Sequence, residues 1–211
     1  MPTGLGSRYV LVWLKSGGST ELTQEERAVA LEGHFANMGR LFDERFLLMA
    51  GPLGEPRSDP RDRGIFVFDV DEVEEADALT ATDPAVQAGV FVFDAHPFEA
   101  NDPLRTLFEL EEDNEEGLDG MRMFVVARSP HAERADAAVA SLVAEGMVTV
   151  SGRLGGGREA TGLYVVNAET VDEARQMLIA ASGEQDLEWD LSPWFGSKTL
   201  ERLGRTTGSS P

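Results

Sequence analysis

Hydrophobic residues along the first half of the chain alternate between strand-like runs and helix-like spacing. Residues 8–15, RYVLVWLK, are dense in β-branched, aromatic and aliphatic side chains and end in the turn sequence SGGST, which predicts a buried strand. From Thr23, which forms a possible capping box with Glu26, the spacing changes to that of a helix with one apolar face. That face consists of Leu31, Phe35, Met38 and Phe42.

Three further strand-like runs and a second helix follow in the first half. The strands are predicted at residues 45–51, 64–70 and 89–98, and the helix at 73–79. Asp83-Pro84 should end the second helix, because a residue before proline is disfavoured in the α conformation. The runs at 64–70 and 89–98 are apolar at nearly every position, which predicts that both faces of these strands are buried. The order βαββαβ is that of a ferredoxin-like unit over residues 1–108.

The same order of elements recurs after an acidic segment. Residues 109–120, ELEEDNEEGLDG, are interpreted as a linker because their charges repel one another and favour exposure to water. Residues 121–203 then predict a second ferredoxin-like unit, and 204–211 a disordered tail. The sequence EGMVTVSGRLG at 145–155 aligns with ERFLLMAGPLG at 44–54, which favours an internal duplication.

One βαββαβ unit leaves a sheet face without helices, so its apolar side chains need a second layer. We therefore expect an α+β protein in which the two units pack sheet to sheet, as an intrachain version of a dimeric α/β barrel with pseudo-twofold symmetry. The three tryptophans, Trp13, Trp189 and Trp194, are interpreted as core or inter-unit packing residues. Whether the chain is a monomer or pairs further as a homodimer stays open.

Charge and composition narrow the classes of partner. The formal net charge of -20, from 38 acidic and 18 basic residues, disfavours nucleic acid and anionic membrane surfaces. The chain has no cysteine, which excludes disulfides and cysteine nucleophiles. The N-terminal residues resemble neither a signal peptide nor a membrane span, so a cytoplasmic location is expected.

His34 is the first candidate for chemistry. The alignment of the two halves, offset by about 101 positions, places Ala135 opposite His34 and Ala144 opposite Asp43, and residues 180–187 contain no counterpart of Asp83-Pro84. A residue needed only for packing should occur in both halves, so the presence of His34 in one half alone favours a functional role. A histidine that is simply part of the core remains the alternative. Asp43 should lie on the opposite side of a continuous helix, whereas Asp83 can approach His34 and orient its imidazole for general acid or base chemistry. Asp83 is alternatively a turn residue.

These residues carry a resemblance to a known family. Residues 8–98, with His34, Ala50-Gly51-Pro52 and Asp83-Pro84 followed by Ala88-Gly89-Val90, are similar to the YCII-related (YciI-like) family of the dimeric α+β barrel superfamily. The resemblance implies a ferredoxin-like fold and an active site around a histidine and an aspartate, here His34 and Asp83. The second half departs from the family pattern at each site position, which puts a second site in doubt.

Four other residues are candidates for binding a small-molecule substrate. Asp43, Gly51, Pro52 and Arg63 are candidate substrate-binding residues; Arg63 belongs to an arginine-containing loop that is either an anion contact or simply solvated. No spacing matches a helical metal motif, and no metal or cofactor is expected. Two hypotheses follow: a cofactor-independent enzyme of lyase, isomerase or hydrolase type acting on a small organic molecule, or a non-catalytic small-molecule-binding or assembly module of the same fold.

Overall fold

A computed structural model describes residues 7–19, 21–101, 103–112, 120–155, 160–183 and 186–203. The first unit contains β1 (Ser7–Ser16), α1 (Gln24–Asp43), β2 (Leu47–Pro52), β3 (Asp62–Phe68), α2 (Val73–Thr80), α3 (Pro84–Gln87), β4 (Phe91–Ala100) and α4 (Thr106–Glu112). The second contains β5 (Met121–Ser129), α5 (Ala132–Ala144), β6 (Val148–Leu154), β7 (Thr161–Val166), α6 (Val171–Ser182), β8 (Asp190–Ser197) and α7 (Leu200–Leu203).

All eight strands join one antiparallel sheet that curls into a nearly closed barrel. The strand order is β2-β3-β1-β4-β6-β7-β5-β8, so each half has the strand order of a ferredoxin-like unit. The halves meet at a short β4–β6 ladder and, on the other side, at a bridge between Leu53 and Trp194. Near that bridge the Gly54 amide donates to the Pro193 carbonyl at 2.7 Å. The predicted α+β barrel made within one chain is thereby confirmed.

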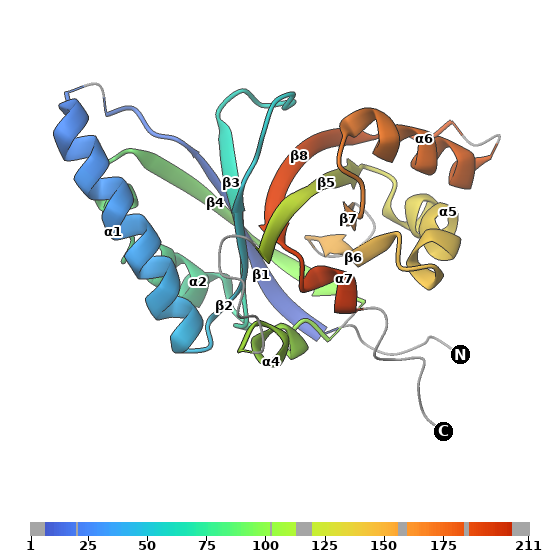
Figure 1. The fold of residues 1–211 in the computed structure, drawn as a ribbon, viewed down its shortest axis with the longest axis horizontal. Helices are drawn as coiled ribbons and strands as arrows, with labels where there is room; N and C mark the ends of the chain where they lie inside the picture. The colour runs from blue at the N-terminus through green and yellow to red at the C-terminus, as the bar shows by residue number, and fades with distance from the viewer. Residues whose placement is uncertain are drawn as a thin grey trace.

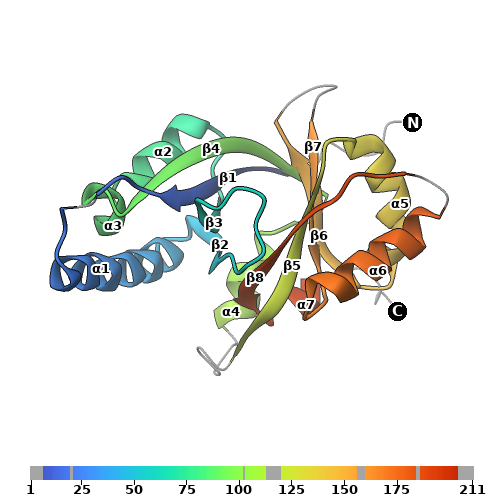
Figure 2. The ribbon, with the colours of Figure 1, turned by 90° about the horizontal axis from the view of Figure 1, so that it is seen from above.

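Helices cover the outer faces of the barrel on two opposite sides. Figures 1 and 2 show α1 and α2 outside the first half and α5 and α6 outside the second. Strand residues alternate accordingly: Tyr9, Leu11 and Trp13 face the core inside the barrel, while Val10 and Val12 pack against the helix layer. The interior core also takes in side chains from α4 and α7, which cap the bottom of the barrel in Figure 1.

Two local expectations differ from the structure. Residues 106–112 form α4, whose Leu107, Phe108 and Leu110 are buried in the barrel core, so the first part of the expected linker is helical. The rest of that segment, residues 113–119, and the expected disordered tail at 204–211 lie outside the described residues. The second face of β4 is not fully buried: Val92, Asp94 and His96 are exposed, in the part of β4 that lies before its short ladder with β6 at Phe98–Ala100.

Candidate functional site

Helix α1 places His34 against the sheet. Its capping box is present: Thr23 Oγ1 accepts from the Glu26 amide at 3.2 Å, and Glu26 Oε2 accepts from the Thr23 amide at 2.8 Å. The face that α1 buries consists of Ala30, His34, Asn37 and Leu41. The face that α1 buries is therefore rotated from the predicted apolar stripe by about one residue, or roughly 100°.

The rotation changes the role of the predicted stripe. Phe35 has 67% of its surface exposed, and Leu31, Met38 and Phe42 are only partly buried. These apolar side chains line cavities beside the helix instead of forming its main contact with the sheet. Apolar side chains around a hollow are typical of a ligand site.

His34 forms a hydrogen bond with Asp83 inside the first unit. The distance from His34 Nδ1 to Asp83 Oδ2 is 2.6 Å, and the two residues are 7% and 0% exposed. Asp83 does not end α2, which stops at Thr80; it is the N-cap of the short helix α3, and its Oδ1 accepts from the Ala85 amide at 2.8 Å. One carboxylate oxygen is thus held by the backbone while the other holds the imidazole.

The surroundings leave one nitrogen of His34 available. Its ring lies 5.7 Å from the ring of Phe66, 5.3 Å from Phe91 and 5.4 Å from Phe35, measured between centroids. Within the described part of the chain, Asp83 is the hydrogen-bond partner of Nδ1 and none is found for Nε2. With Asp83 ionised, Nδ1 carries the proton, and Nε2 of a neutral imidazole has a free lone pair.

A cavity of about 140 Å³ lies beside His34. Three other predicted site residues, Gly51, Pro52 and Arg63, line it together with His34. Arg63 reaches it from β3, where its guanidinium also donates to the Pro60 and Asp62 carbonyls at 2.8 and 2.9 Å. The structure therefore brings predicted site residues of α1, β2 and β3 together at this cavity, while Asp83 contacts His34 without lining the cavity itself.

Asp43 lies elsewhere. Helix α1 is continuous to Asp43, so this residue remains on a different side of the helix from His34, as its spacing predicts. It lines a second cavity, of about 490 Å³, whose walls also include Trp194 and Ser197 of β8. Trp194 was interpreted only as a packing residue, and no sequence signal indicates that it approaches the first unit's helix.

The equivalent place in the second half has different chemistry. Pro52 pairs with Gly64 in the first half and Arg153 with Gly162 in the second, and Phe66 and Tyr164 each lie two residues beyond those glycines. Tyr164 donates to Asp136 Oδ1 at 2.6 Å, and Arg153 donates to Asp136 Oδ2 at 2.6 and 2.9 Å. Burial, with the bond to Asp136, raises the pKa of the Tyr164 hydroxyl, and the same carboxylate raises the pKa of Arg153. Tyr164 and Arg153 thus both find their hydrogen-bond acceptor in the Asp136 carboxylate.

Among the described residues, no group of three or more His, Cys, Asp or Glu side chains is arranged to hold a metal ion. No helix in the same ranges combines the length and apolar character required to cross a membrane.

The sequence comparison identifies the domain that carries the His34–Asp83 pair. Residues 8–96 match the model of the YCII-related domain, so the first half of the chain carries a YCII-related domain and the resemblance is confirmed there. Comparison with curated proteins gives no match.

Comparison with solved structures finds distant likenesses. A "putative monooxygenase" from Lactobacillus acidophilus NCFM superimposes with a TM-score of 0.49 at 9% identity, covering 91% of this chain and 97% of that one. CrmK, a flavoenzyme involved in the shunt product recycling mechanism in caerulomycin biosynthesis, gives a TM-score of 0.30 at 16% identity, covering 89% of this chain and 45% of that one. Neither likeness carries an argument about activity.

Proposed function

We propose that the first unit is an enzyme site for a small organic molecule, in which His34 moves a proton and Asp83 orients it. The observation that carries this proposal is the buried 2.6 Å contact between His34 Nδ1 and Asp83 beside a cavity. Any buried histidine needs a hydrogen-bond partner, but a backbone carbonyl would be enough for packing, whereas a carboxylate fixed by a second hydrogen bond can also stabilise an imidazolium. His34 and Asp83 both lie within residues 8–96, the part of the chain that matches the YCII-related domain.

The geometry suits a proton shuttle at Nε2. A neutral imidazole can take a proton from a carbon beside a carbonyl and return it to the same or a neighbouring atom, so the electrons and protons balance without another reactant. Asp83 would stabilise the imidazolium formed in between. The rings of Phe35, Phe66 and Phe91 exclude water around the imidazole, which strengthens electrostatic effects there.

This shuttle is isomerase chemistry; in a lyase the imidazolium would give the proton to the leaving group, and in a hydrolase the imidazole would take it from a water molecule that is the second reactant, in each case without a cofactor. The alternative is a non-catalytic binding or assembly module, and the structural observation that favours it is the self-satisfied Tyr164–Asp136–Arg153 group at the equivalent place in the second half. One experiment can separate these functions if it reads both binding and proton transfer.

We would screen uncharged carbonyl compounds by thermal shift against wild type and His34→Gln, with His96→Gln as the matched control. His96 is an exposed histidine on β4 and lines neither cavity. A hundredfold excess over the dissociation constant should stabilise the binding-competent proteins by about 2.7 kcal/mol. Bound compounds are then incubated in D2O, and deuterium incorporation is measured by mass spectrometry.

The enzyme proposal expects stabilisation and deuterium incorporation with wild type and His96→Gln, and neither with His34→Gln. Asp83→Asn should retain binding but lose most of the exchange rate, because the amide stabilises an imidazolium less well than a carboxylate. Binding that is lost in His34→Gln but never accompanied by exchange or conversion would favour the binding module. Binding and exchange that are unchanged in His34→Gln would rule out a role for this histidine.

A further inference from the structure

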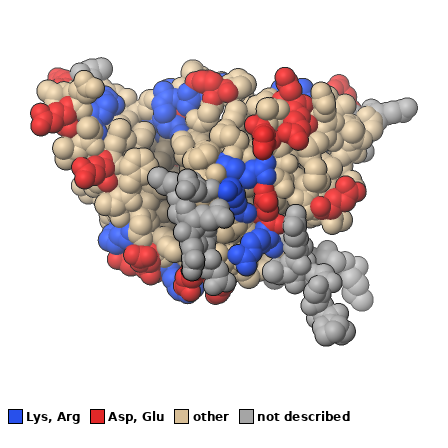
Figure 3. Space-filling model, viewed as in Figure 1, with Lys and Arg blue, Asp and Glu red and all other residues tan. Residues whose placement is uncertain are grey.

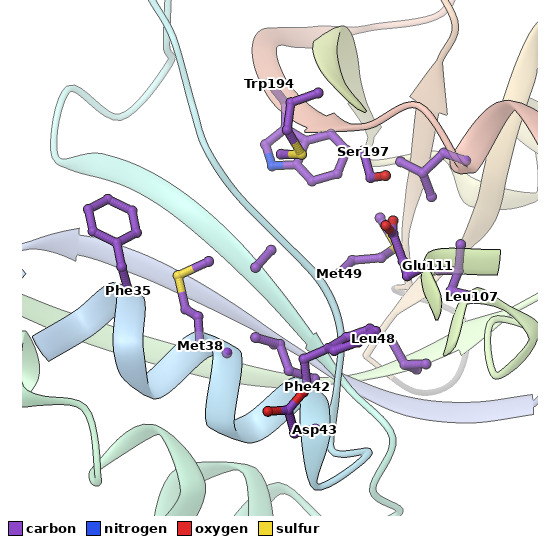
Figure 4. Close-up of a pocket in the computed structure, with 15 residues that line it drawn as sticks. Phe35, Met38, Phe42, Asp43, Leu48, Met49, Leu107, Glu111, Trp194 and Ser197 are labelled. Atoms are coloured by element: carbon purple, nitrogen blue, oxygen red, sulfur yellow. The ribbon is translucent and has the colours of Figure 1, made fainter. Parts of the chain in front are cut away.

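The larger cavity lies where the two halves of the chain meet. It occupies about 490 Å³, within the usual range for ligand pockets, and is lined by α1, β2 and α4 from the first unit and by β5, β8 and α7 from the second. Figure 4 shows Phe35, Met38 and Phe42 on one side of the cavity and Trp194 and Ser197 on the other. In Figure 3 the part of the hollow beside α1 that is visible is mainly tan, the colour of residues other than Lys, Arg, Asp and Glu.

The two cavities adjoin each other. Phe35 and Met38 line both of them. Trp194 lines the larger cavity, and its indole nitrogen lies 2.8 Å from where a Cβ on Gly51 would be, while Gly51 itself lines the smaller cavity. The indole nitrogen therefore lies against Gly51 of β2, a residue of the smaller cavity, while Trp194 itself lines the larger one.

This indole nitrogen is a donor without an acceptor. Trp194 is 1% exposed, and its Nε1 has no hydrogen-bond partner within the part of the chain that the structure describes. Buried tryptophan N–H groups usually find a partner, because a buried hydrogen-bond donor left unpaired is costly. An oxygen acceptor on a ligand that reached this indole nitrogen would remove that cost.

Charge and side-chain type indicate the nature of the ligand's body. The larger cavity is lined mainly by apolar residues, among them Met49 and Met121, whose flexible side chains adapt to irregular shapes. Its ionisable side chains, Asp43 and Glu111, are both carboxylates, which would repel an anionic body. The exposed Phe35 lies at the junction and can cover a bound apolar molecule.

We propose that the two cavities form one site for an elongated, uncharged molecule, with a carbonyl or hydroxyl oxygen at His34 and an apolar body in the larger cavity. Trp194 of the second unit is the positioning residue that donates its N–H to that oxygen. This inference rests on the proposed function for the location of the reacting end. It makes the second unit part of the site, since the halves build the apolar subsite together.

The test uses three probes: cyclohexanone, which has the carbonyl without a large body; 1-tetralone, which has both; and tetralin, which has the body without the carbonyl. Dissociation constants are measured by isothermal titration calorimetry with wild type, Trp194→Phe, Gly39→Leu and His34→Gln. Gly39 lines the larger cavity, and a Cβ there would meet no described atom within 4 Å, so a leucine can fill the cavity. Gly39→Ala is its matched control.

With wild type, 1-tetralone should bind at least tenfold more tightly than either other probe. Trp194→Phe should weaken 1-tetralone about tenfold, since a net hydrogen bond contributes about 1.4 kcal/mol, and should leave tetralin unchanged. Gly39→Leu should weaken 1-tetralone and tetralin but not cyclohexanone, whereas Gly39→Ala should weaken none. Unfolding curves of each variant check that the fold is retained.

The two proposals fail in different ways. If His34→Gln abolishes ketone binding while Trp194→Phe and Gly39→Leu leave the affinity for 1-tetralone unchanged, the combined site is wrong and the proposed function stands. If Trp194→Phe and Gly39→Leu weaken 1-tetralone while His34→Gln has no effect, the larger cavity binds ligand but the role of His34 is wrong. Failure of both ketones to bind wild type, or equal affinity for tetralin and 1-tetralone, overturns the combined site.

Discussion

Gly33 controls how closely the helix that carries His34 approaches the helix that Asp83 caps. A Cβ at Gly33 would lie 2.8 Å from Pro84 Cγ and 2.9 Å from Pro84 Cβ. Because carbon atoms pack best about 3.5–4.0 Å apart, Gly33→Ala must push α1 and α3 apart by roughly 0.7 Å. His34 and Asp83 are the chain neighbours of Gly33 and Pro84, so their 2.6 Å contact should lengthen to about 3.3 Å, beyond the usual N–H···O range.

A second glycine of the same helix supplies the reference. A Cβ at Gly39 would have no described atom within 4 Å, so Gly39→Ala should show only the helix propensity of alanine, a gain of about 0.5–1 kcal/mol in the free energy of unfolding. Gly33→Ala has the same intrinsic gain but adds an overpacking cost of about 1–3 kcal/mol. We therefore expect the two variants to differ by about 1–3 kcal/mol, with Gly33→Ala the less stable.

Urea unfolding gives the free energies, and ¹H–¹⁵N spectra of the imidazole rings report the Nδ1–H of His34. Gly33→Ala should shift the His34 resonances and leave those of the exposed His96 in place, while Gly39→Ala should shift neither. Equal stabilisation by both substitutions, together with unchanged His34 resonances in Gly33→Ala, would refute the argument that this glycine sets the His34–Asp83 distance.

Two further predictions concern the second unit and the place where β2 meets β8. Tyr164→Phe should lower the free energy of unfolding at pH 8 by about 1.5–3 kcal/mol, because it removes a buried hydrogen bond to the Asp136 carboxylate. Burial raises the pKa of Tyr164 in the folded state, so the stabilisation that Tyr164 contributes is complete below the unfolded-state pKa of about 10 and declines above it. Urea unfolding at pH 8 and 10.5 should therefore show a smaller difference in the free energy of unfolding between wild type and Tyr164→Phe at the higher pH. Gly51→Ala should cost about 1–3 kcal/mol or more, because its Cβ would lie 2.0 Å from the Phe195 carbonyl oxygen and force β2 from β8. Gly54→Ala, whose nearest contact would be 3.2 Å, is the control, and equal urea midpoints for the two would contradict this account.

Local sequence signals predicted most of the elements and made Asp83 a candidate partner for His34. Strand runs, the Thr23–Glu26 capping box and the order βαββαβ depend on residues close together in the chain, and the structure has them. The one-sided occurrence of His34, with the spacing that separates it from Asp43, directed attention to Asp83, and the structure brings these two side chains together. The resemblance to the YCII-related domain sharpened that choice.

Tertiary packing decided the rotation of α1 and the extent of the cavities. Helical periodicity identifies an apolar stripe but not which edge of it faces the sheet, and here Gly33 against Pro84 and His34 against Asp83 favour a rotation that leaves Phe35 exposed. Segment 106–112 appears acidic in sequence, yet it forms a helix because three apolar side chains bury themselves in the barrel.

The placement of Trp194 illustrates the same limit most clearly. Its sequence context is that of an ordinary strand residue, and only closure of the barrel between β2 and β8 brings its N–H beside Gly51, more than a hundred residues earlier in the chain. Amino-acid sequence by itself determined most of the strands and the long helices, because these depend on local spacing, and it identified His34 and Asp83 as a candidate pair. Their contact, across 49 positions of the chain, was decided by the tertiary structure. The shape of the cavities and the residues that the second half contributes to them follow from long-range strand pairing and packing, which no local pattern contains.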